Sequence, residues 1–66
     1  MVKCPNCGST AQVRNIGGPF LSDNQRILSE NFNCGCGAHF EVDYERNDES
    51  YWEVSEIFIH FIEKVK

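Results

Sequence analysis

The clearest pattern of hydrophobic and polar positions in this chain lies between residues 38 and 46. Apolar and polar side chains alternate there one by one: His39, Phe40, Glu41, Val42, Asp43, Tyr44 and Glu45. A period of two places the apolar side chains on one face of a strand and the polar side chains on the other. The pattern therefore predicts a β-strand with one buried face and one acidic face, followed by a polar turn at residues 46–49.

Two shorter extended segments are predicted upstream of this strand. Residues 11–16 alternate imperfectly and predict a short strand, and residues 26–33 predict a second one. Gly17-Gly18-Pro19 lies between them and is a strong chain breaker, and Ser22, Asp23 and Asn24 supply turn residues. We therefore expect a loop over residues 17–25. Loops of that length often carry function.

The pattern of residues 50–66 is compatible with two structures. Ser50 and Glu53 fit a helix capping box, and one stripe at helical spacing holds Val54, Ile57, Phe58, Phe61, Ile62 and Val65. Trp52 and Ile59 fall outside that stripe, and the segment is rich in β-branched and aromatic residues, which favour strands. We predict a C-terminal strand that pairs with residues 38–46, with an amphipathic helix as the alternative.

The size of the chain indicates a single domain that needs a staple. It has 66 residues, and domains this small bury too little surface to be secure without a disulfide or a metal. Its four cysteines could pair as disulfides in three ways. The N-terminus has no apolar signal segment and no stretch is long enough to span a bilayer, so we expect a cytoplasmic protein. Reduced thiols in that compartment favour metal binding.

The spacing of the cysteines specifies the expected site. Cys4 and Cys7 form a C-x2-C pair, Cys34 and Cys36 form a C-x-C pair, and glycine follows each pair. Four thiolates suit one tetrahedral Zn²⁺, and iron is a possible substitute. Because such a site has no open position for water or substrate, we expect a structural site and no enzymatic activity.

These two cysteine pairs resemble the knuckles of the zinc-ribbon superfamily. The resemblance covers residues 3–45 and is to a small stand-alone ribbon, of the kind common among phage and bacterial proteins. It implies a zinc-stabilised domain of antiparallel strands over residues 1–66, with knuckles at 4–7 and 34–36 and one zinc ion bound by Cys4, Cys7, Cys34 and Cys36. Residues 47–66 would then be a C-terminal extension.

The distribution of charge separates the candidate functions. The net charge is −4, and residues 41–66 carry eight of the ten acidic side chains. A protein that binds nucleic acid through phosphates normally has a basic patch. We therefore expect a protein-interaction module that uses loop 17–25 or the aromatic residues of 51–62, the latter in a homodimer or on another protein. The alternative is a nucleic-acid-binding regulator that uses Lys3, Arg14 and Arg26.

Overall fold

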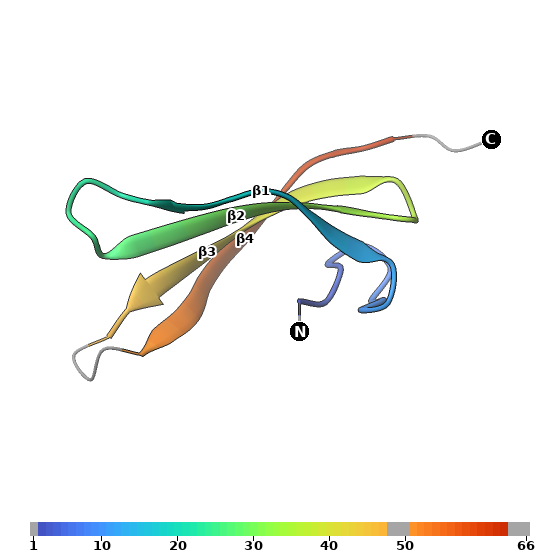
Figure 1. The fold of residues 1–66 in the computed structure, drawn as a ribbon. Coiled ribbons are helices and arrows are strands. Elements are labelled where there is room, and N and C mark those ends of the chain that lie inside the picture. Colours follow the sequence, from blue (N-terminus) through green and yellow to red (C-terminus); the bar gives the residue numbers. More distant parts are fainter. Residues whose placement is uncertain (1, 48–50, 64–66) are drawn as a thin grey trace.

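The protein folds into one antiparallel sheet. The computed structural model describes residues 2–47 and 51–63. They form β1 (Val13–Leu21), β2 (Ile27–Cys34), β3 (Ala38–Arg46) and β4 (Trp52–Ile62), which lie in the order β1-β2-β3-β4 (Figure 1). The N-terminal segment, residues 2–12, lies to one side of this sheet. The prediction of a small β-rich domain of antiparallel strands is confirmed.

The C-terminal segment is a strand, and the helix alternative is wrong. β4 pairs with β3 from Arg46 opposite Trp52 to Ala38 opposite Ile62. Within residues 2–47 and 51–63 there is no helix, and so none that could cross a bilayer. Several residues of the sequence argument lie outside the described part of the chain: Asp48, Glu49, Ser50, Lys64, Val65 and Lys66.

The prediction of a loop over residues 17–25 is wrong in its first half. β1 continues through Gly17-Gly18-Pro19 to Leu21, and only residues 22–26 connect it to β2. The register of β1 against β2 is irregular here, because the pairing passes from Gly17 directly to Phe20. Pro19 has no N–H to donate to the ladder. The strand accommodates this tripeptide by an irregular register instead of ending.

The two faces of the sheet differ in chemistry. On the face that we call the apolar face, directly paired side chains of three strands lie side by side: Phe32, Phe40 and Ile59, then Glu30, Val42 and Ile57, then Leu28, Tyr44 and Val54. On the opposite face, which we call the acidic face, β3 and β4 place Glu41, Asp43, Glu45, Glu53 and Glu56. The alternation predicted for residues 38–46 is therefore present, with its apolar side chains inward.

The core lies on the apolar face, where the N-terminal segment covers the sheet. Its buried residues are Cys4, Phe32, Cys34, Ala38, Phe40 and Val42. The rings of Phe32 and Phe40 stack with their centroids 5.5 Å apart. Two of these six core residues are cysteines, so the core and the cysteine cluster form one packed unit.

Candidate metal centre

The first cysteine pair lies in a tight turn at the start of the chain. The N–H of Gly8 donates to the carbonyl of Cys4 over 2.9 Å, and the N–H of Cys4 donates to the carbonyl of Ser9 over 2.9 Å. Gly8 has a φ of 79°, a backbone conformation that costs glycine nothing. The turn thereby brings Cys4 and Cys7 to the same side of the backbone, as the C-x2-C-G pattern predicts.

The second pair lies in the turn between β2 and β3. Cys34 is the last residue of β2, and the N–H of Gly37 donates to its carbonyl over 2.9 Å. Gly37 has a φ of 99° and leads into β3 at Ala38. The shorter C-x-C spacing is accommodated because the turn is closed within four residues, 34–37.

The structure brings all four sulfur atoms together. The Sγ atoms of Cys4, Cys7, Cys34 and Cys36 all lie within 4.8 Å of one another. Sulfur atoms of the two pairs lie in contact: Cys4 Sγ is 3.7 Å from Cys36 Sγ, and Cys7 Sγ is 3.6 Å from Cys34 Sγ. Each close contact joins the first turn to the second. The cluster therefore links the start of the chain to its middle.

These distances fit a tetrahedral metal ion and do not fit disulfides. Four thiolates at about 2.3 Å from a central ion lie about 3.8 Å from one another in a regular tetrahedron. A disulfide requires the two sulfurs to be about 2.05 Å apart, and all four thiols are free. The donor set and its spacing thus match the group that the sequence predicts, and these four residues can hold one metal ion.

Neighbouring N–H groups favour the thiolate form of Cys36. The side-chain amide of Asn6 donates to Cys36 Sγ over 3.4 Å. This hydrogen bond, followed by one from the backbone N–H of Ala38, lowers the pKa of Cys36 to about 6, against the opposing effect of burial. A metal binds the thiolate and not the thiol. The turn thus favours the metal-binding thiolate form of Cys36 even without a bound ion.

Cys34 shows the opposite behaviour in the same cluster. The backbone N–H of Cys36 acts to lower its pKa, but burial and the neighbouring thiols together outweigh it and raise the pKa to about 12. Four thiols packed this closely cannot all ionise without a cation between them. The metal-free cluster therefore keeps Cys34 in the thiol form at neutral pH, and a divalent ion between the sulfurs would favour its ionisation.

The accessibility of the four cysteines also fits a scaffold role. Cys4 and Cys34 are buried, Cys36 is half-buried and only Cys7 is exposed. Four protein ligands complete a tetrahedral coordination sphere, so no position remains where a substrate could bind the ion. The arrangement can tie two chain segments together.

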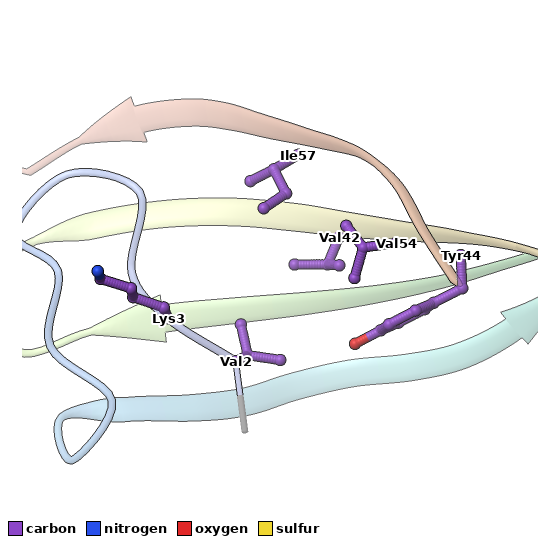
Figure 2. A pocket seen from close by; sticks show the side chains of 6 residues that line it. All are labelled: Val2, Lys3, Val42, Tyr44, Val54 and Ile57. Atoms are coloured by element: carbon purple, nitrogen blue, oxygen red, sulfur yellow. The ribbon is translucent and has the colours of Figure 1, made fainter. Parts of the chain in front are cut away.

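The basic residues considered for nucleic acid are not gathered in one place. Arg14 is opposite Asn33 on the acidic face. Lys3 lies in the N-terminal segment over the apolar face (Figure 2), and Arg26 is in the turn between β1 and β2. These three residues therefore lie on different elements, with Arg14 and Lys3 on opposite faces of the sheet.

The structure also contains a groove that the sequence pattern does not indicate. It has a volume of about 460 Å³, lies on the apolar face, and is lined by Val2, Lys3, Val42, Tyr44, Val54 and Ile57. Figure 2 shows residues of the N-terminal segment facing side chains of β3 and β4 across it. The groove exists because the first turn is docked on the sheet, a tertiary arrangement that no local pattern specifies.

No known family, curated protein or solved structure matches this chain. The resemblance to zinc ribbons thus depends on the two cysteine pairs and on the antiparallel sheet. At the level that the structure supports, the protein is a small β domain whose four cysteines are arranged to hold one metal ion.

Proposed function

We propose that this chain is a non-enzymatic protein-interaction module whose fold is stabilised by one structural Zn²⁺ ion. Cys4, Cys7, Cys34 and Cys36 are the proposed ligands. The close sulfur–sulfur contacts between the two turns support a single four-sulfur site. Zinc suits this set because it has no geometric preference of its own and accepts four thiolates, although iron also binds such cages.

The proposed role of the ion is to hold the N-terminal segment on the sheet. Only six residues of the described chain are buried hydrophobics, and Cys4 and Cys34 are two of them. Structural zinc contributes roughly 10–16 kcal/mol to the folding of small domains, which exceeds the total stability of most such domains. Removal of the ion should therefore unfold the protein.

The observation that carries the interaction role is the exposure of β4. Every residue of this strand is exposed, yet five of its large apolar side chains lie together on the apolar face: Trp52, Val54, Ile57, Ile59 and Ile62. Isolated exposed apolar residues are ordinary, but a continuous group of this size marks a contact surface. Residues 51–62 are thus a better candidate than the connection at 22–26, which is short and polar.

Native mass spectrometry with and without a chelator tests the proposed metal. We expect one zinc ion per chain, and loss of the β-sheet circular dichroism signal when the ion is removed. Cys7→Ser should lose the ion at a chelator concentration that leaves the matched control Thr10→Ala loaded, since Thr10 is exposed and lies close to the first turn. A protein that stays folded without metal, or that carries iron when purified, would contradict this proposal.

A gel-shift titration separates the interaction role from nucleic-acid binding. The acidic net charge of −4 opposes binding to phosphates. We expect no shift of single- or double-stranded DNA or RNA at low salt. A salt-dependent shift that is lost in the double variant Arg14→Ala/Arg26→Ala would favour the regulator instead.

A further inference from the structure

The acidic side chains of the sheet are concentrated on one face. Five carboxylates of β3 and β4 point to the acidic face, and two directly opposed pairs there have like charge: Asp43 with Glu56, and Glu45 with Glu53. Opposed like charges repel each other across a sheet. A partner with negative charge is therefore disfavoured on this face.

The apolar face carries few charges among the described residues. Its β4 positions carry Trp52, Val54, Ile57, Ile59 and Ile62, all uncharged and all exposed. The single β2 carboxylate on this face, Glu30, accepts a hydrogen bond from Asn15 over 3.1 Å and interacts with the hydroxyl of Tyr44. Lys3 and Arg46 bring positive charge to the same face. Two copies of this acidic protein can thus approach through their apolar faces without bringing their carboxylates together.

The apolar face is also incompletely covered. Domains usually bury each apolar sheet face against a second layer, and here the N-terminal segment is the only second layer among the described residues. A groove remains between Val2 of this segment and Ile57 of β4 (Figure 2). An apolar surface with few charges would complete this layer.

The size of the face suits a dimer. The molecule measures 45 × 19 × 14 Å, an outline of the same order as the roughly 800 Å² that each partner contributes to a standard interface, and the N-terminal segment forms part of the surface on that side. Where the N-terminal segment does not cover the face, side chains such as Trp52 and Ile57 are exposed and can fill the distance of about 10 Å that separates two sheets packed face to face. A two-fold arrangement uses the same surface on both copies and closes on itself.

From these observations we infer that a second copy of this chain covers the apolar face, forming a two-layer dimer whose centre is the groove lined by Val42, Tyr44, Val54 and Ile57. This inference rests on the proposed interaction role and names its partner. The acidic faces of both copies remain outward. Each copy contains its own complete cluster of four cysteines, so metal binding does not require the dimer.

Two neighbouring residues of β4 provide a matched pair of variants. Ile57 is 45% exposed and lies on the apolar face, whereas Phe58 is 43% exposed and lies on the acidic face opposite Glu41. Ile57→Glu should raise the dimer dissociation constant at least about 100-fold, because it buries an unpaired carboxylate in the interface. Phe58→Glu should change it less than about threefold. Sedimentation equilibrium of the zinc-loaded proteins measures both constants.

The wild-type protein gives a second readout that needs no substitution. Trp52 is the single tryptophan of the chain and lies on the apolar face. Its fluorescence should shift to longer wavelength on dilution, with a midpoint at the dissociation constant from sedimentation. Three results would overturn the dimer: a monomer at about 100 µM, a dimer that Phe58→Glu disrupts and Ile57→Glu does not, or a dimer whose Trp52 emission is independent of concentration. A zinc-loaded protein that stays monomeric would contradict the dimer but would leave the proposed interaction role, with a different partner. A dimer that stays folded without metal would contradict the structural zinc ion but not the dimer.

Discussion

Glu63 donates its backbone N–H to the carbonyl of Gly37 over 2.7 Å, so the end of the β3–β4 hairpin is bonded directly to the second cysteine turn. Gly37 also donates to Cys34, which is a candidate ligand. The metal centre and the exposed strand β4 are therefore connected through one glycine. This connection makes the conformation of Gly37 important both for the site and for the surface that β4 presents.

Substitution of this glycine should damage both regions. A Cβ atom at Gly37 would collide with the backbone of Glu63, and the φ of 99° disfavours any side chain. We expect Gly37→Ala to lower the free energy of unfolding by about 2 kcal/mol or more and to increase hydrogen exchange at residues 60–63.

A matched glycine gives the control for this experiment. At Gly17 a Cβ atom would meet only ordinary contacts, the nearest being Phe20 at 3.7 Å. Gly17→Ala should therefore change the stability by less than about 1 kcal/mol. Chemical denaturation of the zinc-loaded proteins compares the two substitutions. Equal losses of stability would show that the positive φ of Gly37 and its close contact with Glu63 do not determine the stability of this turn.

Asn6 is expected to strengthen metal binding without touching the ion. Its amide donates to Cys36 Sγ over 3.4 Å and is the first cause of the lowered pKa of that thiol. Loss of a side chain that hydrogen-bonds a metal ligand costs roughly 10–100-fold in metal affinity. Asn6→Ala should therefore bind zinc at least about 10-fold more weakly than the wild type. Competition titrations with a chromophoric chelator measure this difference.

The pH dependence of zinc uptake provides a more specific readout of Asn6. If the amide stabilises the Cys36 thiolate, its removal should shift the midpoint of zinc uptake to higher pH, because protons then compete more effectively for the sulfur. Thr10→Ala is exposed and near the same turn, and its affinity and midpoint should match the wild type. An unchanged midpoint in Asn6→Ala would argue that the amide only shapes the turn.

Phe40 is expected to be the most costly aromatic side chain to remove. It is fully buried and stacks on Phe32, so Phe40→Ala should destabilise the zinc-loaded protein by about 3–5 kcal/mol. Phe58→Ala removes the same side chain from an exposed position on β4 and should cost less than about 1 kcal/mol. Denaturant unfolding at one zinc concentration measures the unfolding free energy of both variants. Similar losses of stability would show that Phe40 is not a central residue of the core.

The sequence predicted the β3 strand and the cysteine cluster because each depends on a simple rule. Phe40, Val42 and Tyr44 alternate without interruption, and an uninterrupted period of two has one structural solution. The cysteine pairs with their glycines predicted two turns, and a single ion requires the turns to meet. In both cases, local sequence and tertiary packing demand the same arrangement.

The ambiguity of β4 has a physical cause that the structure reveals. Two register shifts, between the partners of His39 and Phe40 and between those of Asp43 and Tyr44, insert His60 and Ser55 as extra residues. Val54, Ile57, Ile59 and Ile62 thereby share a face although their spacing mixes two and three residues. That spacing imitates a helix, and no pattern within the strand indicates where a bulge will occur.

Gly17-Gly18-Pro19 misled the prediction for a similar reason. The tripeptide normally ends a strand, but β1 continues because β2 supplies partners on either side of it, at Asn31 and Ser29. Pairing across strands decided the outcome, and the local sequence did not. The groove on the apolar face likewise depends on contacts between segments far apart in the chain.

The last prediction concerns Glu41 and Asp43, adjacent carboxylates on the acidic face of β3. A hydrogen bond with Asp43, burial and the charge of Asp43 raise the pKa of Glu41 above 4.5, while His60 acts in the opposite direction. A raised pKa means that the folded protein disfavours the ionised form. The associated stability is fully present below the unfolded pKa and is lost as the pH rises through the folded pKa. At neutral pH, Glu41→Gln should therefore be more stable than the wild type.

The pH dependence and a double variant distinguish this effect from a general one. Acid also releases metal from thiolates in both proteins, so the informative quantity is the difference in unfolding free energy between variant and wild type. This difference should narrow as the pH falls through the folded pKa of Glu41 towards its ordinary value of 4.5. Asp43→Asn relieves the same repulsion, so the double variant should gain less than the two single gains added together. Additive gains, or a wild type more stable than Glu41→Gln at neutral pH, would show that the two carboxylates do not interact as the structure indicates.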